Sequence, residues 1–255
     1  MSTPPASAAS GRRRLLVVLA AIVVVIIVVV VFVFGRFTSS TTSTAPTLYG
    51  HAGAVNNNTP VQAPPIPVAS GSLIVVFLGW VNGLAAGGNT VSISDSLFDD
   101  YHLAVTSGLA YNHSEAVYVA SPATASTSLV VSVQFEGGAL RQGGSVAVID
   151  VSNANLASVD GTNWSTGDGP TAIIALDTNH SGDLVLFGAA GRGVSGPFTA
   201  ASGETLLDTG TGVSGPAQDG SAFGTFSAKA NGSAIVLTAG LSVPTYWVTV
   251  AIAIR

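Results

Sequence analysis

The side chains most suited to chemistry stand together in one short segment, D-T-N-H-S-G-D at residues 177–183. Its oxygen-bearing side chains occupy alternate positions and a glycine takes the sixth place, which is the spacing of a calcium-binding loop. The bidentate glutamate expected at the twelfth position is missing, because Gly188 stands there. The segment therefore predicts either a Ca²⁺ site or a polar hairpin turn before the next strand. The candidate metal ligands are Asp177, Asn179, Ser181 and Asp183.

A second acidic group, Asp95, Asp99 and Asp100, follows a predicted strand. Three carboxylates at this spacing could hold a cation at the edge of a β-fold, but a solvated acidic turn has the same sequence. We therefore keep both interpretations for this segment.

Trp164 lies in a polar segment, D-G-T-N-W-S-T-G-D-G at residues 160–169, which predicts a flexible loop. An aromatic ring in such a loop can stack on a sugar or bind a partner, with Asn163 and Asp168 as nearby hydrogen-bonding groups. Alternatively, the ring covers one end of the hydrophobic core. Trp164, Asn163 and Asp168 are our candidate ligand-binding residues.

No arrangement of residues predicts catalysis. Two G-x-G-x-x-G segments, at residues 191–196 and 210–215, are each followed directly by proline and by strand-like sequence. The helix N-terminus that would hold a pyrophosphate is therefore not predicted, and we interpret both segments as turns. The four histidines are scattered and the chain has no cysteine, which excludes thiol chemistry and disulfides. We expect that the protein is not an enzyme.

The segments that must position these residues are predicted to be strands. From about residue 70, short β-branched runs alternate with clusters of Gly, Asn, Asp, Ser and Pro, and no segment has helical periodicity. This pattern predicts an all-β fold, an antiparallel β-sandwich. The predicted strands are 72–80, 89–95, 101–106, 115–121, 127–135, 144–151, 171–176, 183–190, 203–207, 221–228, 233–239 and 245–254.

The predicted domain contains an internal repeat. The segment S-G-S-L-I-V-V-F at residues 70–77 returns as S-G-D-L-V-L-F at residues 181–187, and each half ends on an alternating apolar strand. Two copies of one strand plan predict two similar halves. We favour a single sandwich built from both halves over two small ones, because the join at residues 160–170 is short.

Short motifs in both halves give a resemblance to a known class. They are Gly71-Ser72-Leu73, then Ser94-Asp95-Ser96 before Tyr101, and the repeated opening Gly182-Asp183-Leu184. In these motifs residues 70–255 resemble the jelly-roll-like β-sandwich domains on the surfaces of bacteria, archaea and phages. The resemblance implies a surface or structural role and carries over no catalytic residues.

The N-terminal region predicts a membrane anchor. Residues 15–34 are an unbroken run of 20 apolar residues, which as a helix spans about 30 Å, the thickness of the hydrocarbon core of a bilayer. Three arginines precede the run and one follows it, so residues 1–14 are expected in the cytoplasm and the rest outside the cell. Cleavage as a signal peptide is the alternative, but the first small-residue site, Ser43-Thr44-Ala45, lies well beyond the run.

The next segment, residues 35–69, is predicted to be a stalk. It is rich in Ser and Thr at 38–44 and rich in proline from Pro60 onward, which favours an extended spacer. The region beyond the apolar run also contains five Asn-x-Ser/Thr glycosylation motifs, although Asn and Ser/Thr are also common together in turns. They lie at Asn57, Asn112, Asn163, Asn179 and Asn231.

The charge balance excludes one class of partner. Beyond residue 34 there are 13 acidic residues and 8 − 3 = 5 basic ones, because Arg12 to Arg14 precede the run. Nucleic-acid binding needs a basic surface, so we expect none. We expect a single-pass cell-surface protein with a structural or adhesive β-sandwich, whose partners are the bilayer and surface glycans or other envelope proteins. The alternatives are a carbohydrate-binding module and a pilin-like filament subunit.

Overall fold

The computed structural model describes residues 45–56, 60–81, 90–110, 113–122, 124–136, 144–192, 198–212, 221–232 and 234–255. They belong to one compact unit, Thr44–Arg255. The predicted cytoplasmic tail and the predicted membrane-spanning residues 15–34 lie outside the described residues. Within the described ranges, no helix has the length and apolar character needed to cross a membrane.

The described part of the chain is almost entirely antiparallel β-structure, which confirms the all-β prediction. Its one helical element is the single 3-10 turn η1 (Leu156–Ser158). The strands are β1 (Thr47–Asn56), β2 (Val61–Gln62), β3 (Ile66–Val68), β4 (Leu73–Val81), β5 (Thr90–Asp95), β6 (His102–Thr106), β7 (His113–Ala120), β8 (Ser126–Leu129), β9 (Val131–Glu136), β10 (Gly144–Ser152), β11 (Val159–Asp177), β12 (Leu184–Arg192), β13 (Thr199–Ala200), β14 (Thr205–Gly212), β15 (Ser221–Lys229) and β16 (Ala234–Ile254).

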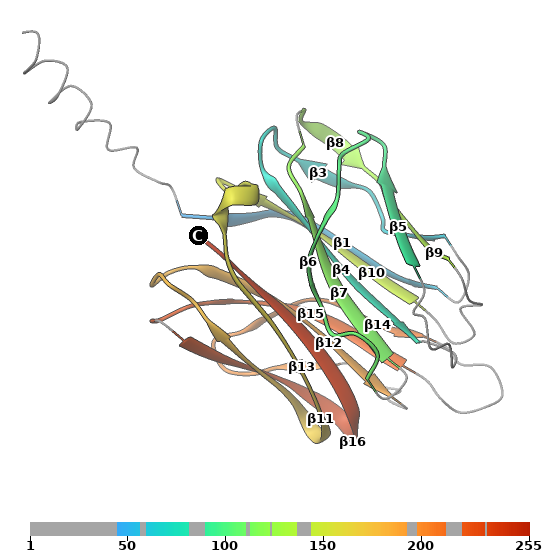
Figure 1. The fold of residues 1–255 in the computed structure, drawn as a ribbon, viewed down its shortest axis with the longest axis vertical. Coiled ribbons are helices and arrows are strands. Elements are labelled where there is room, and N and C mark those ends of the chain that lie inside the picture. The colour runs from blue at the N-terminus through green and yellow to red at the C-terminus, as the bar shows by residue number, and fades with distance from the viewer. Residues whose placement is uncertain are drawn as a thin grey trace, which may run out of the picture. The chain divides into compact units, whose positions relative to one another are not determined.

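The first half of the unit is built around a five-stranded sheet with the order β1-β10-β4-β7-β6 (Figure 1). β4 and β10 are mostly apolar because both faces of these two central strands are buried. One face packs against two small sheets, β2-β9-β5 and β3-β8, and encloses a core of its own. That core includes Val76, Leu78, Trp80, Val133 and Phe135.

The second half is a sheet with the order β11-β16-β12-β15-β14, and β13 pairs with β16. β11 and β16 are long and form a two-stranded ribbon whose register shifts sharply between Gly169↔Thr245 and Thr171↔Gly240. Pro170 and Pro244 stand within this irregularity, where proline is tolerated because the ladder is interrupted. Beyond this point the ribbon folds back over β12 and β15, so apolar residues of all four strands pack together around Phe187 (Figure 1).

The second sheet repeats the strand order of the first. β10, β4, β7 and β6 are neighbours in the first sheet, and the second part of β16, then β12, β15 and β14, are neighbours in the same order in the second. The outermost strands also correspond, because β1 pairs with β10 in the first sheet and the first part of β11 pairs with β16 in the second. In the second half, the first part of β16 takes the place that β9 has in the first half. β13, which pairs with it, takes the place of β5.

A third hydrophobic cluster lies between the halves. It joins residues of β4 and β10 with residues of β12 and the second part of β16. These are the same faces of equivalent strands: Leu73 and Val75 on one side, Leu184 and Leu186 on the other. The structure therefore differs from the single shared core that we favoured, because each half has its own core and the third cluster holds the halves together.

The fold begins earlier than the sequence predicted. β1, β2 and β3 lie in the segment interpreted as a stalk, and β1 pairs along its whole length with β10. The sequence of β1 is rich in Gly and Ala, which have low strand propensity, so pairing with a buried neighbour decides its structure. Prolines flank the short strands β2 and β3, and Pro67 lies within β3 at an irregularity of its pairing, so no long ladder is interrupted.

Candidate metal centre

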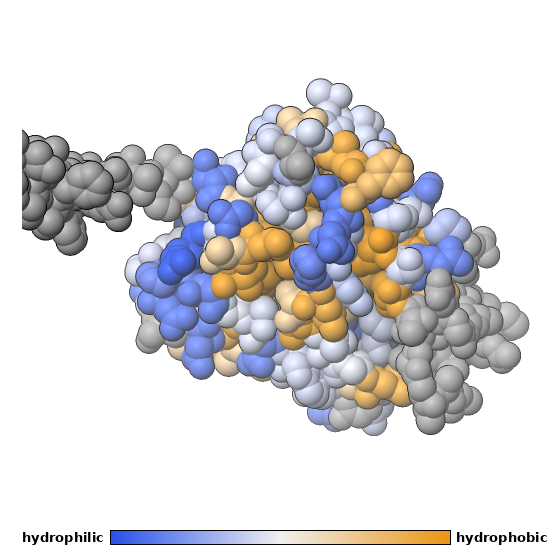
Figure 2. All heavy atoms as spheres, turned by 45° about the horizontal axis from the view of Figure 1, so that its top comes forward, coloured by the Kyte–Doolittle hydropathy of each residue, from blue (hydrophilic) through white to orange (hydrophobic). Residues whose placement is uncertain are grey.

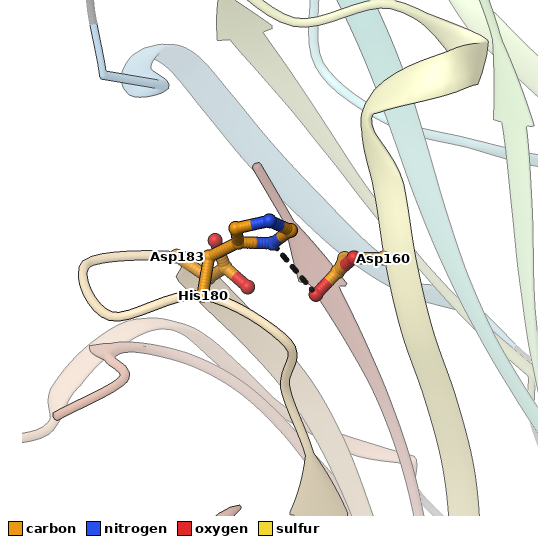
Figure 3. A group of neighbouring side chains, drawn as sticks. All are labelled: Asp160, His180 and Asp183. Atoms are coloured by element: carbon orange, nitrogen blue, oxygen red, sulfur yellow. Dashed lines mark ion pairs between the residues drawn. The ribbon is translucent and has the colours of Figure 1, made fainter. Parts of the chain in front are cut away.

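Asp160, His180 and Asp183 come together at one end of the second sheet, and their side chains point toward one another (Figure 3). One potential ligand atom from each residue lies within 4.8 Å of the others. Asp160 is the second residue of β11, whereas His180 and Asp183 belong to the turn that joins β11 to β12. The cluster therefore brings the start of β11 next to the turn that follows the end of β11.

The fold-back of β11 brings Asp160 to this turn. The first and last parts of the strand approach so closely that a Cβ on Gly161 would lie 2.6 Å from the carbonyl oxygen of Asp177. Nδ2 of Asn163 donates to the carbonyl oxygen of Ala175 at 2.6 Å. The backbone N–H of Asn179 donates to Oδ2 of Asp160 at 2.7 Å. These contacts fix the Asp160 carboxylate beside the turn.

The turn itself is anchored to the connection between β15 and β16. Gly182, with a φ of 92°, donates its N–H to the carbonyl oxygen of Ala230 at 2.8 Å. The N–H of Ala230 in turn donates to the carbonyl oxygen of Asp183 at 2.9 Å. Thr178 adds a hydroxyl donor to the carbonyl oxygen of Gly232 at 2.6 Å. These three hydrogen bonds hold the turn in place, and the Asp183 side chain points toward the cluster.

The two carboxylates have opposite electrostatic environments. The backbone N–H of Asn179 is the main cause that lowers the pKa of Asp160 to about 2. Burial raises the pKa of Asp183, and the hydrogen bond that its side chain shares with Asp160, together with the charge of Asp160, raises that pKa further. Asp183 is only 2% exposed, and its Oδ2 has no hydrogen-bond partner among the described residues. Buried oxygens of this kind are rare because leaving them unpaired is costly.

The third residue of the cluster, His180, has an accessible imidazole side chain. Nδ1 of His180 lies 3.5 Å from Oδ2 of Asp160, and 47% of the His180 side chain is exposed. The cluster therefore offers one nitrogen and two carboxylate donors, a set that binds divalent cations.

Of the four predicted calcium ligands, the structure brings only Asp183 into this cluster. Asp177 ends β11 and is exposed, opposite Ala234. Nδ2 of Asn179 donates to Oδ1 of Asp160 at 3.1 Å, and Ser181 is exposed. Sequence reasoning missed His180, because this residue falls between the alternate ligand positions of the calcium pattern and the four histidines are scattered along the chain. It missed Asp160 because local spacing says nothing about a partner 20 positions away.

The other acidic group lies in a turn that the Asp95 side chain holds in place. Within it, burial and the neighbouring Asp95 raise the pKa of Asp99 to about 6. The Asp95 carboxylate accepts the N–H groups of Leu97 at 2.8 Å and Asp99 at 3.2 Å, and the hydroxyl of Tyr101 at 2.6 Å. Asp100 is exposed, and its Oδ2 lies 3.7 Å from Nε2 of His102. The Asp95 side chain thus stabilises its own turn.

Trp164 lies in β11 and not in a loop, which corrects the sequence prediction. The polar segment around it forms a strand because it pairs residue by residue with the apolar end of β16, and Trp164 stands opposite Val250. Its side chain remains 46% exposed. Asp168 stands opposite Tyr246 and shares the face of Trp164, whereas Asn163 points to the other face.

The asparagines of three of the five glycosylation motifs lie within the described residues. The side-chain nitrogens of Asn163 and Asn179 both donate to neighbouring backbone or carboxylate oxygens. Asn231 is exposed in the connection from β15 to β16. Asn57 and Asn112 lie outside the described residues.

Two hollows also occur in the described part. A cavity of about 20 Å³ between the halves is lined by Glu115, Phe223 and Thr225 among others, and its size suits a water molecule and not an organic ligand. An open groove of about 520 Å³ runs beside Leu48, Thr205 and Lys229. The face of the unit in Figure 2 shows apolar side chains in several patches separated by polar ones.

No protein-family model matches this chain, and neither the curated proteins nor the solved structures include one with significant similarity.

Proposed function

We propose that this chain is a single-pass membrane protein that displays an all-β unit outside the cell, where the unit has a structural or adhesive role. The observation that carries the proposal is the run of 20 apolar residues at 15–34, with three arginines before it. The sheet architecture supports the role, because a unit with three buried apolar clusters suits a rigid, long-lived module.

We propose further that each half is a jelly-roll-like β-sandwich. Three observations support this fold: the repeated order of the large sheet, the smaller layer opposite it, and a separate core in each half. The two halves would then be displayed as one unit, because the cluster between them buries Val75, Ile149, Leu186 and Ile252. A unit of this kind presents a large fixed surface to envelope proteins or glycans.

Protease protection on intact cells tests the location. The full-length chain carries a different epitope tag at each end, and cells are treated with protease before and after permeabilisation. We expect the C-terminal tag to be lost from intact cells and the N-terminal tag to be protected until permeabilisation. A C-terminal tag that survives in intact cells, or a chain released from membranes by alkaline carbonate, contradicts the proposal.

Glycan binding is the second candidate, and the exposed aromatic face of the β11–β16 ribbon favours it. Trp164 is 46% exposed and Tyr246 is 44% exposed on the same face. Two aromatic side chains on a sheet surface can stack on sugar rings. A glycan array with the full-length chain in detergent tests this, with Trp164→Ala as the variant and Ile173→Ala, equally exposed on the same strand, as the control. Binding that Trp164→Ala abolishes supports the candidate, and silence on every sugar removes it.

A further inference from the structure

The two halves contain the same turn in front of their central strand. The pairing registers align Leu73 of β4 with Leu184 of β12, which aligns Gly71 with Gly182. Both glycines have positive φ, 71° and 92°, and both donate their N–H to a carbonyl oxygen in the equivalent connection, that of Pro122 at 2.9 Å or Ala230 at 2.8 Å. The backbone of the turn is therefore similar in both copies.

In the first copy the polar groups of the turn are satisfied within the protein. Asp150 of β10 is fully buried and accepts the hydroxyl of Ser72 and the N–H of Ala69, the latter at 3.0 Å. One carboxylate thus closes this turn against the neighbouring strand.

In the second copy every one of these side chains is different. Asp183 replaces Ser72 and His180 replaces Ala69 at the aligned positions. Asp150 stands opposite Ile74, and the residue that stands opposite the equivalent Val185 is Ala253. The carboxylate that closes the first turn is therefore replaced by a methyl group. Instead Oδ2 of Asp183 is buried without a partner in the described structure, and Asp160 and His180 are added beside it.

We propose that Asp160, His180 and Asp183 bind a divalent transition-metal ion of the Zn²⁺ class. A cation supplies the partner that the buried Asp183 oxygen lacks, and it takes the place that Asp150 fills in the other half. The imidazole nitrogen favours such an ion over Ca²⁺ and Mg²⁺, which prefer all-oxygen ligands. Ligand atoms in tetrahedral zinc sites lie about 3.4 Å apart. Nδ1 of His180 and Oδ2 of Asp160 are already 3.5 Å apart, and all three ligand atoms lie within 4.8 Å of one another.

The position of the site indicates what the ion does. Asp160 lies at the start of β11 and the other two ligands follow the end of β11, so a bound ion ties the two ends of the folded-back ribbon together. Three protein ligands leave at least one coordination position for water or for a group from outside the chain. This inference concerns the second half alone and does not depend on the proposed location of the protein.

Calorimetric titration of the full-length chain in detergent, after treatment with a chelator, tests the proposal. Zn²⁺, Ca²⁺ and Mg²⁺ are added separately. We expect one Zn²⁺ to bind per chain, and we expect His180→Ala and Asp183→Asn each to weaken Zn²⁺ binding by about tenfold or more. Asp177→Asn, an exposed carboxylate of the same turn outside the cluster, is the matched control and is expected to leave Zn²⁺ affinity unchanged.

Three results would overturn the proposal. They are the absence of Zn²⁺ binding up to millimolar concentration, Zn²⁺ binding that His180→Ala leaves unchanged, and preferential Ca²⁺ binding that Asp177→Asn weakens. The last result would assign the turn to the calcium pattern of its sequence. His180 is half-exposed, so its replacement by alanine tests the site without a threat to folding.

Discussion

The turn at residues 69–73 and the turn at residues 180–184 have a similar backbone and the same place in the two halves of the molecule, yet their side chains differ. Asp150 closes the first turn through hydrogen bonds from Ser72 and Ala69. The second turn has Ala253 in that place, and Oδ2 of Asp183 is buried there with no partner among the residues that the structure describes. In a repeated fold, the polar groups of a turn can thus be hydrogen-bonded within the protein in one copy, while the same turn carries potential metal-binding side chains in the other.

The first half should be the more sensitive to loss of its carboxylate. Replacement of Asp150 by alanine removes the acceptor of the Ala69 N–H and leaves the Ser72 hydroxyl with the carbonyl oxygen of Ala69 as its remaining acceptor, so we expect the free energy of unfolding to fall by about 2–4 kcal/mol. Urea unfolding measures the change, with exposed Asp177→Asn as a control expected to lie within about 0.5 kcal/mol of the parent. A loss below about 1 kcal/mol would contradict the role given to Asp150.

The second half depends on the close approach within β11. A methyl group at Gly161 would lie 2.6 Å from a backbone oxygen of Asp177, so Gly161→Ala must push the two parts of the strand apart. We expect a loss of about 1–3 kcal/mol in the free energy of unfolding and weaker Zn²⁺ binding. Gly232→Ala is the control, because a Cβ there meets no atom within 4 Å. Equal stability of the two variants would argue against the fold-back as the source of the site.

The halves also differ at one aligned position of the interface between them. Glu115 of β7 lines the cavity there, and the equivalent residue of β15 is Phe223. Burial raises the pKa of Glu115 well above 4.5, so the folded protein retains a proton that the unfolded chain releases. Because the folded protein binds this proton more tightly than the unfolded chain, the free energy of unfolding falls as the pH rises from about 4.5 to the pKa of the folded state. The slope is at most about 1.4 kcal/mol per pH unit.

We therefore expect Glu115→Gln to remove this part of the pH dependence. Thermal unfolding between pH 5 and pH 8 measures it: the difference in stability between the glutamine variant and the parent should move in favour of the variant as the pH rises. A difference that stays constant over this range would show that Glu115 titrates in the folded state as it does in the unfolded chain.

The smallest effect is expected at the second turn in the absence of metal. Asp183→Asn removes a buried negative charge whose Oδ2 has no partner in the described structure, so we expect metal-free stability to stay equal or to rise by up to about 1 kcal/mol. In saturating Zn²⁺ the order should reverse, because only the parent gains the stabilisation that comes from binding. Differential scanning calorimetry with and without Zn²⁺ measures both. A variant that is less stable in both conditions would indicate a purely structural role for Asp183.

The sequence predicted most strands of residues 70–255 because turn residues and β-branched runs mark them clearly. It also revealed the repeat through the S-G-S-L and S-G-D-L openings. It missed β1, whose Gly- and Ala-rich sequence forms a strand only through pairing with β10. It assigned Trp164 to a loop because the residues around it are polar, although they form a strand through pairing with the apolar end of β16. Local pattern cannot show pairing of this kind.

The candidate site could be predicted only in part, for the same reason. Asp183 stands out within a recognisable ligand pattern, but Asp160 reaches it through the fold-back of β11. The unpaired oxygen of Asp183 depends on Ala253, which lies 70 positions further along the chain. Neither relation has a signal in the sequence near the turn.

Anomalous diffraction at the zinc edge, from crystals of the full-length protein grown with Zn²⁺, tests the central comparison most directly. We expect a single strong peak within bonding distance of Asp160, His180 and Asp183, and no peak at the equivalent turn, where Asp150 bonds to Ser72. A structure with no peak at the second turn, or with equal peaks at both turns, would contradict the account.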